Sequence, residues 1–451
     1  MKKSIKSLCV IVMAVFFLIG CGTNKDNKKN EGKVKLDPEN PVSIRVWHYY
    51  NGSQQAAFDE LVNEFNSTKG KELGINVEGI SQGTVSDLAK TVSDSIDGKV
   101  GVDKLPDIFS SYADTAYYAQ QKGKLVDLSE YFSKEELEKY VDSYIEEGYL
   151  KNDKALYLFP VAKTTESLMI NKTDWEPFAK QTGSSLDELK TIEGVVKVAK
   201  RYYEWTDAKT PNKPNDGKAF YGRDSMANYF VIGMKQLGKD IFEVRDGNVK
   251  FNIDKKLIKR LWENYYVPYI NGYFTALGKF RSDDVKTGDL LAYTGSSMSA
   301  MYFPDRVEDD DKSYDIDYEV LPAPIMSGGE NYKVQQGADM AVTKSDKKHE
   351  YASCVFIKWF TQKEQNLQFV CKSAYMPVLK SANNVKALDD IIEKKSLHIN
   401  NKTYDCLKNV MGDFDNTKYY TTKNFENGSS AREVLETNLS SKAQKDRKEI
   451  E

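Results

Sequence analysis

Residues 42–66, VSIRVWHYYNGSQQAAFDELVNEFN, carry the pattern that decides the fold of this 451-residue chain. Apolar and polar side chains alternate over residues 42–46, as they do in a half-buried β-strand. Ser53 is placed to cap the helix that follows. The apolar face of that helix is formed, at helical spacing, by Phe58, Leu61, Val62 and Phe65. The stretch therefore predicts a strand that leads through a short loop into an amphipathic helix.

The same succession continues along the chain. A second strand is predicted at residues 75–77, and an apolar stripe over residues 85–96 predicts a second helix. A third strand is predicted at residues 106–109, followed by a helix over residues 113–121. Strand, helix, strand, helix, strand with tight connections is the pattern of an open, mostly parallel sheet in an α/β fold.

In such sheets, ligands bind just outside the carboxyl ends of the strands. Here Trp47, His48 and Tyr50 follow the first strand, and Tyr112 and Asp114 follow the third. Aromatic faces combined with hydrogen-bonding groups suit a polyhydroxylated ligand, whose C–H faces stack on rings. Trp47 and Tyr50 have an alternative role, which is to cover the edge of the sheet.

The first 21 residues have the features of an export signal. A basic start is followed by an apolar run over residues 8–19, shorter than the ~20 residues that a membrane-spanning helix needs. Because Leu18-Ile19-Gly20 precede Cys21, the segment resembles a bacterial lipoprotein signal. We expect a signal peptide at residues 1–20, a lipid on Cys21 and a flexible, lysine-rich leash at residues 21–40. The alternative is an ordinary secretory signal with a chance cysteine.

Composition limits the classes of function. Roughly 410 residues follow residue 40, which is more than one typical core and predicts two lobes. The chain has 64 basic and 67 acidic residues, and their interspersion argues against nucleic-acid binding. Cys354, Cys371 and Cys406 lack the spacing of a disulfide framework, although one bridge stays possible. The three histidines are isolated, so neither a metal site nor a cofactor is expected.

Several segments taken in order resemble a known family. They are residues 42–66, LPDIFSSYADTAYYAQ (105–120), ALYLFPVAKTTESLMINKTDW (155–175), the stretch from QQGADMAV through FIKWFTQKEQN (335–366) and SAYMPV (373–378). Their order and spacing, behind a lipoprotein-like signal, are similar to those of the extracellular solute-binding proteins of ABC importers. This group includes the maltose- and glycerol-phosphate-binding proteins.

The resemblance implies an α/β fold of the type II periplasmic-binding-protein class. Each of two lobes would hold an open, mostly parallel sheet flanked by helices, and the chain would cross between the lobes three times. The crossovers are expected near residues 160–165, 334–337 and 376–379. The first lobe would then comprise residues 41–160 and 337–376, and the second lobe residues 161–336 and 379–451.

The resemblance also assigns residues to the ligand site. Asp114 stands where family members often contact sugar hydroxyls, and Lys163 and Thr164 lie in the first crossover, whose residues line the cleft from the other lobe. The remaining assigned residues are Ser296, Ser297, Tyr302 and Tyr375. Thr164 replaces an acidic residue of maltose-type sites, which puts maltose in doubt, while Lys163 would favour an acidic or phosphate-bearing ligand. Packing or hinge roles are the alternatives for each residue.

The function implied is that of a monomeric receptor outside the cytoplasm. It would bind a small polar solute, a mono- or oligosaccharide, and deliver it to the membrane subunits of an ABC importer. A receptor for a glycerol-phosphate-type or other anionic solute is one alternative. A secreted glycosidase is another, but no pair of carboxylates stands out and no catalytic motif is present, so no catalytic residue is expected.

Three further local patterns give expectations. The acidic stretch 308–317 lacks the spacing of a calcium loop, since Tyr314 stands where the turn glycine should be, so a solvated loop is expected. The stretch Arg281-Ser282-Asp283-Asp284 could form a ligand clamp or a local ion pair, and a surface pair is the default expectation. The residues from Ser430 to Glu433 have the form of a capping box that would start the last helix, and the charged residues 442–451 are expected to fray.

Overall fold

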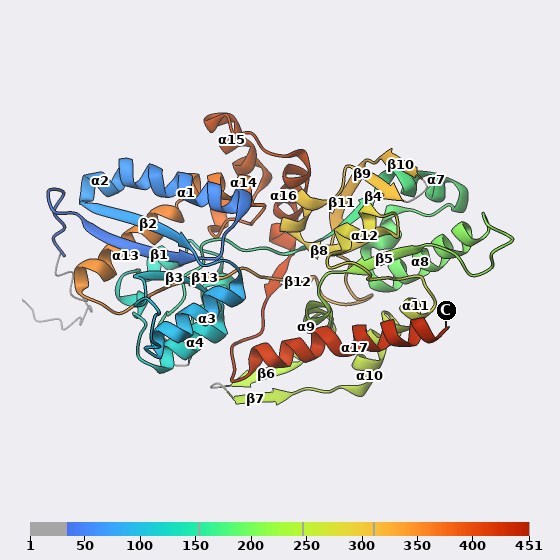
Figure 1. Ribbon diagram of the computed structural model, residues 1–451, viewed down its shortest axis with the longest axis horizontal. Coiled ribbons are helices and arrows are strands. Elements are labelled where there is room, and N and C mark those ends of the chain that lie inside the picture. Colours follow the sequence, from blue (N-terminus) through green and yellow to red (C-terminus); the bar gives the residue numbers. More distant parts are fainter. Residues whose placement is uncertain (1–33, 152–153, 246–247, 310–311, 451) are drawn as a thin grey trace, which may run out of the picture. The chain divides into compact units, whose positions relative to one another are not determined.

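The computed structural model describes residues 34–151, 154–245, 248–309 and 312–450 (Figure 1). The expected signal peptide and Cys21 lie outside the described residues. Residues Lys35–Glu451 form one compact unit. Within the described part of the chain, no helix combines the length and the apolar character needed to cross a membrane.

The first sheet confirms the predicted βαβαβ pattern. Its strand order is β13-β3-β1-β2, with β1 parallel to both β2 and β3 and with β13 antiparallel to β3. These strands are β1 (Val42–His48), β2 (Ile75–Ser81), β3 (Ile108–Ser111) and β13 (Asp339–Val342). The intervening helices are α1 (Gly52–Ser67), α3 (Val85–Ile96) and α4 (Ala113–Gln121). The predicted cap was wrong, because α1 begins one residue before Ser53 and its N-cap residue is Asn51.

The second sheet departs from the prediction. Its order is β11-β4-β8-β5, built from β4 (Glu166–Asn171), β5 (Ala219–Arg223), β8 (Leu290–Ser296) and β11 (Tyr318–Pro322). Strand β4 is antiparallel to both of its neighbours, and only β5 and β8 are parallel. The prediction of a mostly parallel sheet is therefore confirmed for the first sheet and wrong for the second. Strand β4 runs away from the crossover, while β8 and β11 run back toward it.

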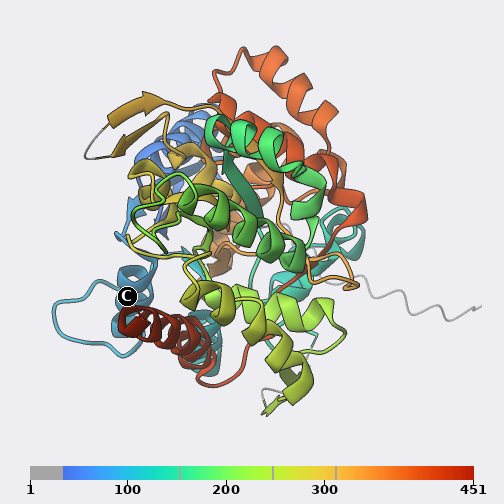
Figure 2. The ribbon, with the colours of Figure 1, turned by 90° about the vertical axis from the view of Figure 1, so that its right-hand side faces the viewer.

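Helices surround the second sheet, and α17 packs against α9 and α11. Figure 2, turned toward this side of the molecule, shows α17 in dark red. The helices are α7 (Lys172–Thr182), α8 (Ile192–Asp207), α9 (Met226–Gln236), α10 (Lys255–Glu263), α11 (Tyr266–Ile270), α12 (Arg281–Lys286) and α17 (Gly428–Ile450). The other helices of the chain are α2 (Lys69–Leu73), α5 (Lys134–Leu137), α6 (Asp142–Glu147), α13 (Lys347–Phe360), α14 (Lys363–Ser373), α15 (Val385–Lys395) and α16 (Asn401–Gly412).

Short strands and 3₁₀ turns complete the fold. The strands are β6 (Phe242–Arg245), β7 (Asn248–Phe251), β9 (Arg306–Asp309), β10 (Lys312–Asp315), β12 (Tyr332–Val334) and β14 (Lys418–Tyr420). The 3₁₀ turns are η1 (Leu128–Glu130), η2 (Leu186–Lys190), η3 (Ser297–Tyr302), η4 (Lys380–Ala382) and η5 (Phe414–Asn416). Within the acidic stretch, Glu308 and Asp309 belong to β9 and residues 312–315 form β10, which is antiparallel to β9. The described residues contain no group of three side chains placed to hold a metal ion.

The three expected crossover segments lie side by side. Lys163 and Met376 exchange backbone hydrogen bonds of 3.1 and 2.5 Å, and Thr164 and Gln336 exchange bonds of 2.7 and 2.9 Å. The division into lobes stays a prediction. One observation argues against its boundary at residue 379. Helix α15, which the sequence analysis assigned to the second lobe, packs against α14, which lies in the segment assigned to the first lobe.

Three other local expectations were wrong, and one question that the sequence left open is answered. Helix α17 begins at Gly428, before Ser430, and it remains helical to Ile450 because its last turns make side-chain contacts, including a hydrogen bond from Gln444 to the carbonyl of Ala276. Arg281 forms a buried ion pair with Asp284 at 2.6 Å, so the pair is not on the surface. The cysteine bridge left open is not formed, since the three cysteines are free and buried.

Candidate ligand-binding cleft

Two adjoining chambers open where the two sheets face each other across the crossovers. The first has a volume of about 340 Å³. It is lined by Tyr49, Asn51, Gln54, Thr84, Val85, Tyr112, Thr164, Ser296, Met298, Tyr302, Gln336, Gly337 and Tyr375. Among these described residues, none carries a charged side chain, and four are tyrosines. The second chamber, of about 390 Å³, shares Tyr49, Val85, Tyr112 and Gln336 with the first.

One side of the cleft is formed by the segments that follow the parallel strands of the first sheet. Tyr49 and Asn51 follow β1, Thr84 caps α3 just after β2, and Tyr112 lies between β3 and α4. Parallel strands end at one edge, so their following loops converge there. The predicted location of the cleft thus agrees with the geometry of the first sheet.

The opposite wall comes from β8 and η3. Ser296 ends β8, and its hydroxyl accepts a hydrogen bond from the backbone N–H of Met298. The sulfur of Met298 accepts a hydrogen bond of 2.6 Å from the amide of Gln54 at the start of α1. At the far end of the cleft, the hydroxyl of Ser429 in α17 donates to the carboxylate of Asp114 in α4. Elements that pack on the two sheets therefore meet on both sides of the chambers.

The crossovers and Tyr375 form the floor. The hydroxyls of Tyr49 and Tyr375 lie 3.1 Å apart, and the backbone N–H of Ala338 donates to the Tyr49 hydroxyl at 3.4 Å. Burial raises the pKa of both tyrosines well above the usual range, so both phenols stay neutral. They can serve a ligand as hydrogen-bond donors or acceptors and as flat apolar faces.

A buried charge cluster lies directly behind this floor. The Lys163 ammonium is fully buried and lies 2.8 Å from Glu147, 2.7 Å from Asp339 and 3.0 Å from the carbonyl of Gly337. Burial raises the pKa of the Asp339 carboxyl, while the two carboxylates raise the pKa of Lys163. Lys163 thus has two anionic partners within the protein and no free face toward the cleft.

The predicted site residues separate into two groups. Those that line the first chamber are Tyr112, Thr164, Ser296, Tyr302 and Tyr375, and Asp114 lines the second. Those that are buried and line neither chamber are Trp47, His48, Tyr50, Lys163 and Ser297. We leave the buried group out of the proposed site.

Strand length explains why Trp47 and His48 are buried. The strand continues to His48, two residues beyond the predicted end, so Trp47 and His48 keep the inward packing of strand residues. The Trp47 ring packs with Phe109 and Leu88, and the His48 ring lies 4.7 Å from that of Phe58. Burial lowers the pKa of His48 to about 4. Tyr49, which sequence reasoning passed over, is the residue that reaches the cleft.

Other residues of the cleft were also missed. Asn51, Gln54 and Thr84 lie at the starts of helices that follow parallel strands. The strand–loop–helix pattern of the sequence could have predicted that these positions line the cleft. Arg432 lines the second chamber from α17, and nothing in its local sequence indicates this.

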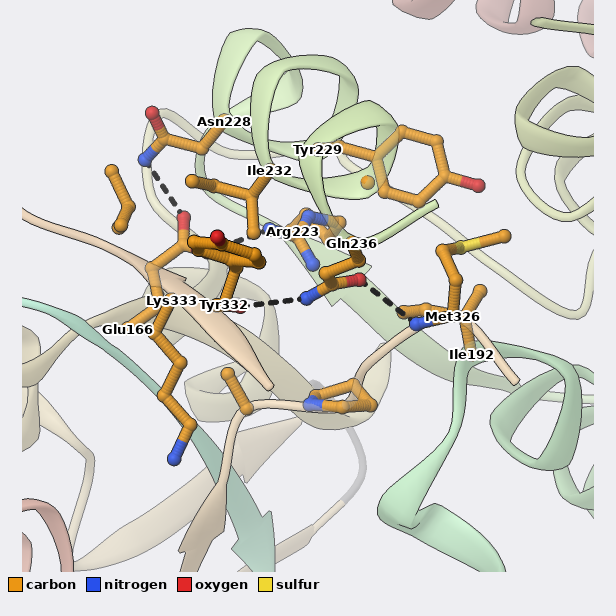
Figure 3. Close-up of a pocket in the computed structure, with 14 residues that line it drawn as sticks. Glu166, Ile192, Arg223, Asn228, Tyr229, Ile232, Gln236, Met326, Tyr332 and Lys333 are labelled. Atoms are coloured by element: carbon orange, nitrogen blue, oxygen red, sulfur yellow. Dashed lines mark hydrogen bonds and ion pairs between the residues drawn. The ribbon is translucent and has the colours of Figure 1, made fainter. Parts of the chain in front are cut away.

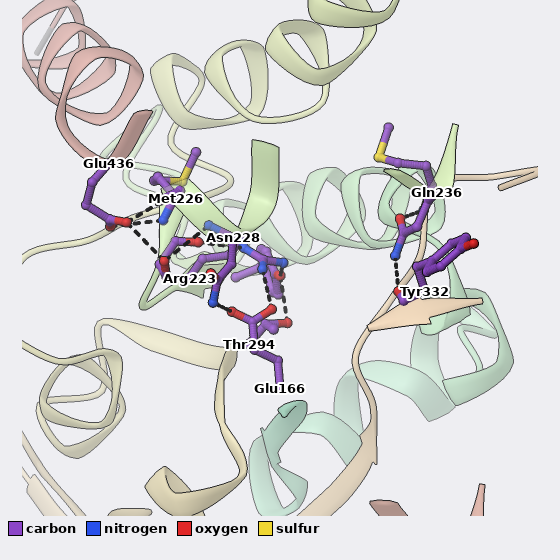
Figure 4. A network of polar contacts seen from close by, with 12 residues as sticks. Glu166, Arg223, Met226, Asn228, Gln236, Thr294, Tyr332 and Glu436 are labelled. Carbon is purple, nitrogen blue, oxygen red and sulfur yellow. Dashed lines mark hydrogen bonds and ion pairs between the residues drawn. The ribbon is translucent and has the colours of Figure 1, made fainter. Parts of the chain in front are cut away.

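A polar network supports the second wall from behind. Glu166 pairs with Arg223 at 2.8 Å and accepts a hydrogen bond of 2.9 Å from the amide of Asn228. Figure 3 shows these side chains around a small cavity of about 20 Å³, which has room for little more than a water molecule. In Figure 4, Glu436 of α17 accepts bonds at the start of α9 from the Ser225 hydroxyl and two backbone N–H groups. The network orients the walls and is too closed to hold a solute.

Comparison with known proteins agrees with this architecture. The family described as bacterial extracellular solute-binding protein matches residues 60–397, and the chain belongs to this family. Its members are binding proteins that act outside the cytoplasm, which places this chain there too. No curated protein matches the sequence.

Solved structures with the same fold cover most of the chain. The cyclic α-maltosyl-1,6-maltose binding protein of Arthrobacter globiformis is 17% identical, with a TM-score of 0.66 over 90% of this chain and 97% of its own. The GacH receptor of Streptomyces glaucescens is 14% identical, with a TM-score of 0.63 over 91% and 97%. UgpB of Mycobacterium tuberculosis, solved with glycerophosphocholine, is 17% identical, with a TM-score of 0.63 over 90% and 97%. At these identities the similarity establishes the fold.

Proposed function

We propose that this protein is a lipid-anchored receptor that binds a mono- or oligosaccharide in the cleft and delivers it to an ABC importer. The observation that carries the proposal is the first chamber. Its lining combines four tyrosines with uncharged amide and hydroxyl groups, drawn from both walls and from the crossovers. Rings that stack on C–H faces, together with groups that exchange hydrogen bonds with hydroxyls, suit a neutral carbohydrate.

The known relatives support the same class of solute. Proteins of similar structure include a cyclic α-maltosyl-1,6-maltose binding protein, the GacH receptor in complex with acarbose and CpMnBP1 with mannotriose bound. An ABC substrate-binding protein of Listeria monocytogenes was solved in complex with cycloalternan. Glycosidase chemistry would need two carboxylates beside one bond. Asp114 and Glu147 line the second chamber, and each already accepts hydrogen bonds within the protein. Binding without catalysis therefore fits the cleft better.

The proposal is tested by calorimetry on the chain from residue 22 onward with a panel of neutral mono- to tetrasaccharides. We expect at least one to bind and to raise the unfolding midpoint. Tyr112→Ala should weaken that binding about 5- to 30-fold, as expected for the loss of one stacked ring and one hydrogen bond. Tyr351→Ala, which removes an exposed ring on α13 outside both chambers, is the matched control. If no saccharide bound, the proposed class of solute would be wrong.

The membrane anchor rests on the sequence around Cys21. We expect the mature chain to begin at a diacylglycerol-modified Cys21, with the body held as a monomer on its leash near the importer. Mass spectrometry of the membrane fraction checks this expectation. An unmodified Cys21 in the mature, membrane-bound protein would contradict it.

A further inference from the structure

The second chamber differs from the first in carrying charge. Its lining includes three ionisable acidic or basic side chains, those of Asp114, Glu147 and Arg432. Whether this chamber favours a neutral, cationic or anionic group depends on which of these charges are already compensated within the protein.

Both carboxylates already accept hydrogen bonds within the protein. Glu147 accepts hydrogen bonds of 2.8 Å from Lys163 and 2.9 Å from the amide of Gln335. Asp114 accepts from the Ser429 hydroxyl, and its other carboxylate oxygen lies beside Gly428 at the start of α17, a 23-residue helix. The positive end of a helix dipole stabilises a carboxylate at that position. Asp114 also stands in the first turn of its own helix, α4, where the same argument holds.

Among the described residues, Arg432 has only a neutral partner. Its guanidinium donates a hydrogen bond of 2.8 Å to the side-chain oxygen of Asn228, which is a neutral acceptor. In the part of the chain that the structure describes, no carboxylate forms an ion pair with Arg432. A guanidinium has five N–H donors, so most of them are not used by Asn228.

The guanidinium is also held in place. Asn228 is almost fully buried, and its amide nitrogen donates to Glu166, which fixes its oxygen toward Arg432. Glu166 is fixed in turn by Arg223 (Figure 4). A positioned guanidinium with free donors is well suited to bind a carboxylate or a phosphate through two hydrogen bonds.

We propose that the solute carries an anionic group, a carboxylate or a phosphate, which Arg432 binds in the second chamber while an uncharged sugar ring occupies the first. The two chambers adjoin at Tyr112 and Gln336, so one molecule can reach both. This inference rests on the proposed function and makes its solute more specific. Lys163, the cation that the sequence suggested for this role, is fully buried between Glu147 and Asp339 and cannot fill it.

The test is calorimetry at low salt on matched neutral, uronate and 6-phosphate members of the glucose, galactose and mannose series, as mono- and disaccharides. Glycerol 3-phosphate is included as an anion without a sugar ring. We expect an acidic member to bind about 10- to 100-fold more tightly than its neutral counterpart, the range of a charge-assisted hydrogen bond. A gain in affinity for the uronates over the neutral sugars would identify the anionic group as a carboxylate. A gain in affinity for the 6-phosphates would identify it as a phosphate.

Two variants localise the effect. Arg432→Gln should remove the preference for the acidic member over its neutral counterpart. Lys445→Gln removes one positive charge from the exposed side of the same helix and should leave the preference intact. Unfolding midpoints of both variants show whether α17 stays packed. Added salt should reduce the preference of the parent protein and have little effect on Arg432→Gln.

The outcomes separate this inference from the proposed function. A neutral saccharide that binds as tightly as its acidic counterparts, or an acid preference that survives Arg432→Gln, would overturn the role of Arg432 and leave the saccharide receptor standing. If glycerol 3-phosphate were the one probe that bound, and Arg432→Gln abolished its binding, the contact between Arg432 and an anion would be supported. The proposal that the solute is a saccharide would then be overturned. If no probe bound, both proposals would fall.

Discussion

Replacing Lys163 with methionine should destabilise the protein strongly, because the change leaves two carboxylates without their cation. The Lys163 ammonium is the shared partner of Glu147 and Asp339, and it also donates to the carbonyl of Gly337. Asp339 is almost fully buried, and within the described structure its carboxylate oxygens have no donor other than the Lys163 ammonium at 2.7 Å, so this ion pair is its main compensation.

The size of the effect follows from burial. Removing one partner of a buried ion pair costs about 3–5 kcal/mol, whereas an exposed pair contributes about 0–1 kcal/mol. Lys163 is fully buried, so we expect a loss of about 3–5 kcal/mol in the free energy of unfolding. The loss should shrink as the pH falls, because burial raises the pKa of Asp339 and a protonated carboxyl needs no cation.

Urea unfolding of the chain from residue 22 onward measures this loss. The double variant Lys163→Met, Asp339→Asn should recover a large part of the stability, since one of the two orphaned charges is then gone. Lys386→Met breaks an exposed pair with Asp390 and is the matched control. A loss below about 1 kcal/mol for Lys163→Met, equal to that of the control, would refute the reasoning.

Two further predictions concern His48 and Glu436. Because burial lowers the pKa of His48 from about 6.5 to about 4, the stabilising effect of its neutral form is present above pH 6.5 and is lost as the pH falls toward 4, at a cost of up to about 3 kcal/mol. His48→Asn should flatten this part of the profile of unfolding free energy against pH, and an unchanged slope would show that another group titrates. Glu436→Gln should cost about 1–2 kcal/mol in urea unfolding, because the charged cap on α9 is lost. The exposed Glu433→Gln serves as its control, and equal losses would contradict the capping role.

The sequence by itself determined the parts of the fold that depend on neighbouring residues. Periodicity indicated β1, α1 and α3, because side-chain spacing reports directly which face of an element is buried. It missed the short helix α2, and β3 begins at Ile108, two residues after the predicted start. It could not give the direction of β4 relative to β8 and β11, since strand pairing joins residues more than a hundred positions apart.

Tertiary structure alone decided which of the candidate residues line the cleft. Trp47 and Tyr112 both follow predicted strands and look alike in the sequence, yet one ring is buried in the core and the other lines both chambers. Tertiary structure also decided which charged side chains have a partner of opposite charge. Lys163 is neutralised by Glu147 and Asp339, while Arg432 meets only a neutral amide. Local sequence does not record these partners, because burial and compensation of charge depend on groups that only the folded chain brings together.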